Sequence, residues 1–153
     1  MAAGRMRFTA VLLPLLCAAC ASTPEAAPDL DREAKQFITH PASSTVYVYR
    51  GGTPSLEDDS VLWINGRLIG ATLPQTYFRI NLEPGTQRFA GYGPDSGSLR
   101  LETRPDTVNF VRLQVLSGQS RFELVDPAQG RRELLACCQL LENWRPGQRP
   151  LLR

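Results

Sequence analysis

The sequence has almost no histidine or lysine. Among its 153 residues, His40 is the only histidine and Lys35 the only lysine. A catalytic triad, a histidine base or a histidine-containing metal centre would depend on His40, and no second ligand lies near it at a suitable spacing. We therefore expect an exposed linker histidine, in a protein that is not an enzyme and has no metal ion or cofactor.

The sequence also lacks a net charge beyond its first residues. It contains 17 basic and 15 acidic side chains, and Arg5 and Arg7 belong to an N-terminal leader that carries no acid. The remainder is neutral overall, whereas a general nucleic-acid binder needs a basic surface to displace counterions. We expect no nucleic-acid partner.

Long hydrophobic runs are missing, and the apolar stretch near the N-terminus has the pattern of a signal peptide over residues 1–19. Arg5 and Arg7 precede the apolar residues 8–16, which Pro14 interrupts. This stretch is shorter than the roughly 20 apolar residues that cross a membrane. We predict a secretory signal peptide and no transmembrane helix in the mature protein.

The end of this leader resembles a bacterial lipobox, in which a lipid-modified cysteine becomes the new first residue. Cys20 fits that role, with Ala18 and Ala19 before it, although Cys17 stands where the pattern prefers leucine. The resemblance implies acylation of Cys20, by palmitate for example. Because Ala21 follows where inner-membrane retention favours aspartate, it also implies the outer membrane, facing the periplasm. The alternative is an ordinary signal peptide cut near Ala19, which leaves a free thiol.

Residues 20–43 are predicted to be the lipidated Cys20 and a spacer. Residues 21–28 are small, polar and proline-containing, as in a solvated linker. Residues 29–38 have the pattern of a short helix that ends near His40. Fully extended, such a spacer would reach up to roughly 70 Å.

Residues 44–143 are predicted to form a mainly β domain, an antiparallel β-sandwich of about seven to eight strands with a short C-terminal helix. Period-two alternation and turn signals at roughly ten-residue spacing support this fold. The expected strands are residues 45–50, 61–64, 67–70, 77–82, 87–92, 98–103, 107–116 and 121–125.

Two turn signals fix the expected pairing. Asn65-Gly66 favours a type I′ hairpin, which places Trp63 opposite Leu68 and Leu62 opposite Ile69. Both faces of that hairpin are apolar, which indicates a central pair of strands. Pro84-Gly85 favours a type II turn after a strand whose Phe78, Ile80 and Leu82 face inward.

The C-terminal part changes to a helical period. Leu134, Cys138 and Leu141 recur at helical spacing, which predicts a helix over residues 131–143. A turn at Gln129-Gly130 into a final strand is the alternative. Residues 144–153 are expected to be an irregular tail.

Cys137 and Cys138 are adjacent, which leaves several interpretations open. A metal site needs wider spacing or further ligands, and a disulfide between neighbours would contradict the helix. We favour two small buried thiols on the inner face of that helix, with an intermolecular disulfide as the remaining possibility.

Candidate partner contacts lie in two loops and on exposed aromatic residues. Asp58 and Asp59 belong to an acidic run without the alternating ligands of a calcium loop. Together with Tyr77 and Tyr92, they are our candidate contacts, and the loops are residues 51–59 and 91–97.

Three segments carry a family resemblance: residues 47–50 (YVYR), 64–70 (INGRLIG) and 82–85 (LEPG). They resemble a functionally uncharacterised family of bacterial lipoprotein domains, and the last two are also similar to small PEGA-type surface domains. The resemblance implies a β-sandwich on a cell-envelope protein and supplies no catalytic residues.

The first functional hypothesis is therefore a lipid-anchored, non-enzymatic module that binds an envelope protein or glycan, or contributes to envelope structure. The alternatives are an accessory hydrolase or carbohydrate-active domain with clustered acids, and a subunit of an envelope secretion or transport assembly.

Overall fold

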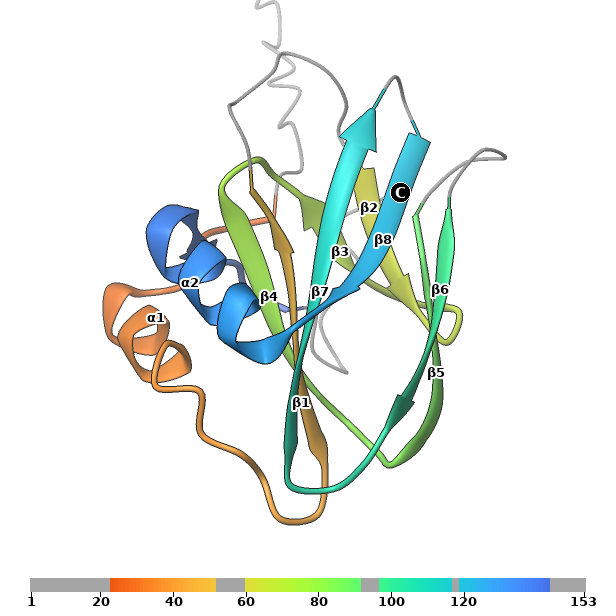
Figure 1. The fold of residues 1–153 in the computed structure, drawn as a ribbon. Coiled ribbons are helices and arrows are strands. Elements are labelled where there is room, and N and C mark those ends of the chain that lie inside the picture. The colour runs from red at the N-terminus through yellow and green to blue at the C-terminus, as the bar shows by residue number, and fades with distance from the viewer. Residues whose placement is uncertain (1–22, 52–59, 92–96, 117–118, 144–153) are drawn as a thin grey trace, which may run out of the picture.

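The computed structural model describes residues 23–51, 60–91, 97–116 and 119–143. Two β-sheets face each other, and two helices lie on the outer side of one of them (Figure 1). The predicted sandwich is confirmed, with nine strands in the described residues. None of the helices in these residues is long and apolar enough to cross a membrane.

The first sheet has five strands in the order β8-β7-β1-β4-β9. Two of its four pairs are antiparallel, β1–β4 and β7–β8, whereas β1 runs parallel to β7 and β4 runs parallel to β9, so this sheet is mixed and not purely antiparallel as predicted. Both parallel pairs join strands that are far apart in the chain, as parallel pairing requires. The bounds are β1 Ser44–Arg50, β4 Thr76–Leu82, β7 Thr107–Leu116, β8 Gln119–Val125 and β9 Gln139–Leu140.

The second sheet has four antiparallel strands in the order β3-β2-β5-β6. The turn from β4 into β5 joins the two sheets, and Gly85 in it has a φ of 130°, which only glycine adopts without strain. The bounds are β2 Ser60–Ile64, β3 Arg67–Thr72, β5 Gly85–Ala90 and β6 Ser98–Thr103.

The β2–β3 hairpin confirms the turn and corrects the register. Asn65 and Gly66 have φ angles of 53° and 76°, as a type I′ turn requires. Trp63 pairs with Leu68 as predicted, but Leu62 pairs with Gly70 instead of Ile69, because the register shifts between Leu62 and Trp63. The predicted central position is also wrong for β3, which is an edge strand.

The strand β1 is buried on both faces. Val46 and Val48 point into the sandwich interior, whereas Tyr47 and Tyr49 point toward the helices. All four side chains are at most 2% exposed. The first sheet therefore separates two cores.

The helix α2 (Pro127–Cys137) begins earlier and ends earlier than predicted. Asp126 caps it by accepting hydrogen bonds from the backbone N–H groups of Ala128 and Gln129. Cys138 is already extended, with φ −123° and ψ 146°, and β9 follows. The helical spacing of Leu141 was therefore misleading, since this residue packs between the sheets.

Residues 23–37 are packed on the domain, which corrects this part of the predicted spacer, whereas residues 38–42 are exposed. It includes the short helix α1 (Pro28–Ala34), whose existence is confirmed. Thr23 is buried, and the N–H of Ala26 donates to the carbonyl of Leu140 at 2.8 Å. Ala34 and Phe37 belong to the core beneath the helices. Their apolar surface is removed from water, so this part of the chain is not a solvated linker.

Candidate functional site

A cleft of about 730 Å³ lies where β4 and the β2–β3 hairpin leave one side of the sandwich open. This volume falls in the range of small-molecule and cofactor sites, roughly 300–1,000 Å³. The lining residues are Ala26, Leu30, Glu33 and Ala34; Ile64, Asn65, Arg67 and Ile69; Arg79, Ile80, Asn81 and Leu82; and Leu140, Leu141, Glu142 and Asn143.

Four consecutive residues of β4 line this cleft, Arg79 to Leu82. Their side chains alternate between the two faces of the sheet, so a cleft that all four line runs along the edge of the strand. The strand β9 covers that edge only at Thr76 and Tyr77. Beyond Tyr77, no strand of the described residues pairs with this edge.

Two buried polar atoms at the cleft have no hydrogen-bond partner in the described structure, Arg79 Nε and Asn143 Oδ1. The other amide atom of Asn143, Nδ2, donates to the carbonyl of Arg79 at 2.5 Å. A buried donor or acceptor without a partner is costly, by about 1–3 kcal/mol. Both atoms are buried, so a ligand would reach them only if the neighbouring side chains move.

The cleft carries charges of both signs. Arg67 and Arg79 lie in its lining together with Glu33 and Glu142. The remaining lining is largely aliphatic, and its described residues include no aromatic ring. Such a site offers an apolar wall and scattered hydrogen-bond groups, and it holds no concentrated charge.

On the helix side of β4, Tyr77 corrects a prediction. Tyr77 was expected to be an exposed contact residue, but it is 1% exposed. Its hydroxyl donates to Asp31 Oδ1 at 2.9 Å, beneath α1. Burial, and then the hydrogen bond to Asp31, raise the pKa of Tyr77. The outward face of this strand is covered by a helix, which the alternation pattern alone does not reveal.

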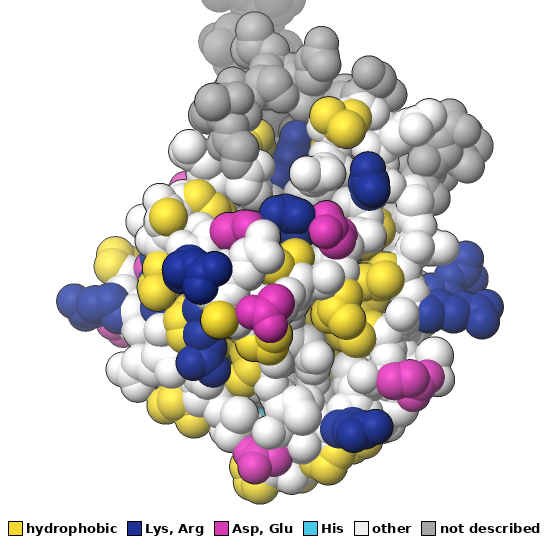
Figure 2. Space-filling model, viewed as in Figure 1, with side chains coloured by type: hydrophobic (Ala, Val, Ile, Leu, Met, Phe, Trp, Pro, Cys, Tyr) yellow, Lys and Arg dark blue, Asp and Glu magenta, His cyan; other side chains and the backbone are white. Residues whose placement is uncertain are grey.

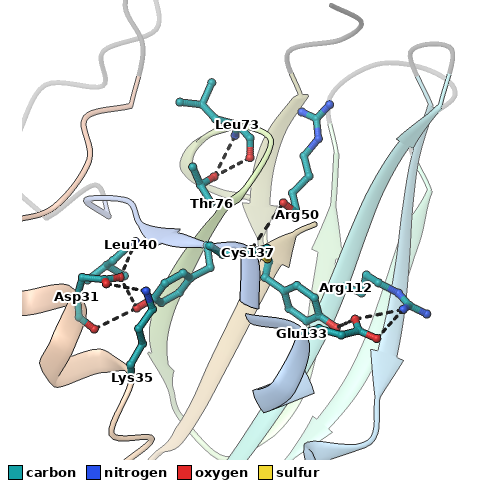
Figure 3. The surroundings of a disulfide bond; sticks show 12 residues. Asp31, Lys35, Arg50, Leu73, Thr76, Arg112, Glu133, Cys137 and Leu140 are labelled. Carbon is teal, nitrogen blue, oxygen red and sulfur yellow. Dashed lines mark hydrogen bonds and ion pairs between the residues drawn. A yellow bond between two sulfur atoms is a disulfide. The ribbon is translucent and has the colours of Figure 1, made fainter. Parts of the chain in front are cut away.

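Asp31 joins α1 to the sheet. Besides Tyr77, its Oδ1 accepts the backbone N–H of Leu140 at 2.9 Å, and its Oδ2 pairs with Lys35 Nζ at 2.7 Å. Figure 3 shows Asp31, Lys35 and Leu140 on one side of the Cys137–Cys138 disulfide, with Glu133 and Arg112 on the other. These contacts position α1, which forms one wall of the cleft.

Glu133 lies on α2 and joins that helix to the sheet. It accepts hydrogen bonds from Tyr49 at 2.5 Å and from Gln129 at 2.7 Å, and it pairs with Arg112, which also pairs with Glu123. Burial acts to raise the pKa of Glu133, but these hydrogen bonds and the Arg112 charge outweigh it and lower the pKa. The hydrogen bond to Glu123 is the main reason that the pKa of Arg112 is raised.

Cys137 and Cys138 form a disulfide with each other. This overturns the expectation of two free thiols on the inner face of a helix. The reason is that α2 ends at Cys137 and the chain is extended at Cys138, so the helix does not oppose a bond between neighbours.

The other predicted site residues are placed as follows. Cys20, Asp58, Asp59 and Tyr92 lie outside the described residues. His40 is exposed, as predicted. The described residues contain no group of three or more histidine, cysteine or acidic side chains that would hold a metal ion.

The face that carries α2, β7 and β8 has interspersed charges. Figure 2 shows acidic and basic side chains scattered over it, with small apolar areas between them. The ion pairs of Arg112 with Glu123 and Glu133 use some of the charges of these elements within the fold.

The fold and the cleft define a helix-covered β-sandwich with an open strand edge. The chain is 25% identical over 134 residues to an uncharacterised protein of Haemophilus influenzae, and the alignment covers 84% of this chain and 80% of that protein. No protein-family model matches the chain. No solved structure matches it. The chain thus has a distant homologue of unknown function, and its role has to be argued from the site.

Proposed function

We propose that the chain is a lipid-anchored lipoprotein of the bacterial outer membrane that faces the periplasm and acts as a non-enzymatic binding module. The observation that supports this localisation is the N-terminal leader, which has Arg5 and Arg7, then an apolar stretch, and then Cys20 after two alanines. The resemblance of residues 47–50, 64–70 and 82–85 to envelope lipoprotein domains supports the same localisation.

The packing of Thr23 adds a geometric consequence. Thr23 is 8% exposed, and the carbonyl of the next residue, Pro24, accepts the N–H of Glu142 at 2.9 Å. Three residue steps separate Thr23 from Cys20, which span at most about 11 Å. A lipid on Cys20 would therefore hold the domain at the membrane surface, not at the end of a long tether.

Binding is the activity that the cleft supports. Its lining combines aliphatic side chains with polar groups, among them Arg79 Nε and Asn143 Oδ1, which have no hydrogen-bond partner among the described residues. Such a combination fixes the orientation of a bound segment while its apolar part is buried. An envelope protein is the partner that we propose.

Lipid anchoring at Cys20 is tested by replacing this residue with serine in cells that are fed labelled palmitate. We expect wild type to take up the label and sediment with membranes, and Cys20→Ser to lose the label and leave the membrane fraction, because several acyl chains are needed for stable anchoring. The matched control is Cys17→Ser, which should retain both properties. Labelling of the Cys20→Ser variant, or an unlabelled wild type, would disprove the assignment.

A further inference from the structure

We infer that the cleft binds an extended peptide segment, which adds a strand to the free edge of β4. This deepens the binding role proposed above and rests on it, but it does not depend on lipid at Cys20. Strand addition uses main-chain hydrogen bonds for affinity and alternate side-chain pockets for specificity.

The hydrogen bonds that β4 makes show which of its N–H and C=O groups point away from β1. In an antiparallel pair, every second residue directs its N–H and C=O toward the partner, and the residues between direct them away. The carbonyl of Tyr77 accepts the N–H of Leu141 at 2.8 Å, and the carbonyl of Arg79 accepts Asn143 Nδ2, so both point away from β1. By the same alternation, Asn81 also directs its N–H and C=O away from β1.

These groups face the cleft, and no strand in the described part of the chain pairs with them. The bridge between β4 and β9 ends at Tyr77, and the cleft begins at Arg79. Among the described residues, the N–H of Arg79 and both main-chain groups of Asn81 therefore have no strand partner, and a new strand would pair with them. An open strand edge of this kind is normally covered or blocked in a stable protein.

The walls of the cleft suit the two faces of an added strand. On one side lie Ile64 and Ile69 of the β2–β3 hairpin, and on the other lie Leu30 and Glu33 of α1. Successive side chains of an extended peptide point to opposite faces. One set would contact the apolar hairpin wall, and the other set the mixed wall of α1.

The charges of the cleft favour a peptide over the other partners. A phosphate or another concentrated anion would meet Glu33 and Glu142 as well as Arg67 and Arg79. A sugar ring would find no aromatic side chain among the described lining residues. A peptide tolerates neighbours of both signs, and its main chain satisfies the strand edge.

The test uses short random peptides displayed on phage and selected on the immobilised chain of residues 20–153 carrying Cys20→Ser. Amide hydrogen exchange is then measured with and without a selected peptide. We expect the amides of Arg79 and Asn81 to exchange more slowly when the peptide is bound, because a new strand accepts their hydrogens.

Two variants separate main-chain from side-chain recognition. Asn81→Pro removes an N–H that points away from β1 and so leaves the β1–β4 ladder intact. Asn81→Ala keeps the N–H, and both variants lose the 3.0 Å hydrogen bond from Thr45 to the Asn81 side chain. We expect Asn81→Pro to weaken peptide binding about tenfold or more and Asn81→Ala to change it less than about threefold.

A peptide methylated on alternate main-chain nitrogens gives the same test on the unchanged protein. One of the two methylation registers should abolish binding, and the other should preserve it. This keeps the inference testable if Asn81→Pro fails to fold.

The inference is overturned if no peptide is selected, if a bound peptide protects neither amide, or if the two Asn81 variants weaken binding equally. Protection by soluble peptidoglycan fragments and by no peptide would assign the cleft to a glycan and overturn it too. So would amides that are already protected in the free chain and become exposed when residues 144–153 are removed, because the chain's own tail would then occupy the edge. None of these results bears on palmitate labelling, so lipid anchoring at Cys20 is tested separately.

Discussion

One face of the five-stranded sheet packs against the second sheet through aliphatic side chains and phenylalanines, whereas its other face packs against two helices through tyrosines. The hydroxyl of Tyr47 donates to the carbonyl of Ala34 at 2.6 Å, and those of Tyr49 and Tyr77 donate to Glu133 and Asp31. Packing between the two sheets is non-directional, whereas packing of the sheet against the helices adds directed hydrogen bonds. The sandwich interior is therefore stabilised by burial alone, and the directed hydrogen bonds of the helix face determine where the helices lie.

The largest effect is expected in the interior. Phe78 is 1% exposed and packs between the sheets, close to Gly70. Phe78→Ala should lower the free energy of unfolding by about 3–5 kcal/mol in denaturant titrations, through lost burial and a cavity. The control is Leu124→Ala on the exposed side of β8, where Leu124 is 51% exposed and a change within about 0.5 kcal/mol is expected. A loss below about 1 kcal/mol for Phe78→Ala would contradict the assigned interior.

A smaller effect is expected where α2 approaches the sheet. A Cβ at Gly130 would lie 2.4 Å from Cβ and Cγ of Phe110. Gly130→Ala should therefore destabilise the protein by about 1–3 kcal/mol, although alanine favours a helix by about 1 kcal/mol. The reverse exchange Ala136→Gly, at an exposed position of α2, reports helix propensity alone and should cost up to about 1 kcal/mol. Stabilisation by Gly130→Ala would show that α2 does not lie this close to β7.

The smallest effect is expected for the directed contacts. Tyr49→Phe removes a donor to Glu133 and should cost about 1 kcal/mol at neutral pH. The folded chain holds the pKa of Glu133 below its ordinary value of 4.5. As the pH falls below that value, the unfolded chain takes up the proton first, so the stability from Glu133 is present above pH 4.5 and lost below it.

Tyr49→Phe should therefore reduce the loss of stability in acid, as measured by unfolding titrations at several pH values. Tyr47→Phe is the matched control, because its hydroxyl donates to a backbone carbonyl that does not titrate. It should cost a similar amount and leave the acid dependence unchanged. An equal change in acid dependence for both variants would refute the special role of Glu133.

The same contrast explains what the sequence predicts well. Alternation identified the strand 98–103 and the strand 107–116 at the bounds that the structure shows, because side-chain period and turn residues are local properties. Asn65-Gly66 specified its own turn for the same reason. The aliphatic interior was also predictable, since Phe78 and Ile80 lie on one side of an alternating strand.

The helix face and the cleft depend on contacts between distant parts of the chain. Nothing local in residues 77–82 shows that α1 covers Tyr77 or that no strand of the described chain pairs with the edge at Asn81. The end of α2 was missed because Leu141 falls at helical spacing by coincidence. The register shift beside Trp63 was missed because a bulge leaves no mark in an apolar pattern.

The docked segment before α1 has a consequence for where recognition takes place. Ala26 lines the cleft, and six residue steps separate it from Cys20, a span of at most about 20 Å. With acyl chains on Cys20, the open edge of β4 would sit within reach of the lipid headgroups. Only polypeptides that themselves run close to the bilayer would meet it often, so confinement to two dimensions would select partners before any side chain does.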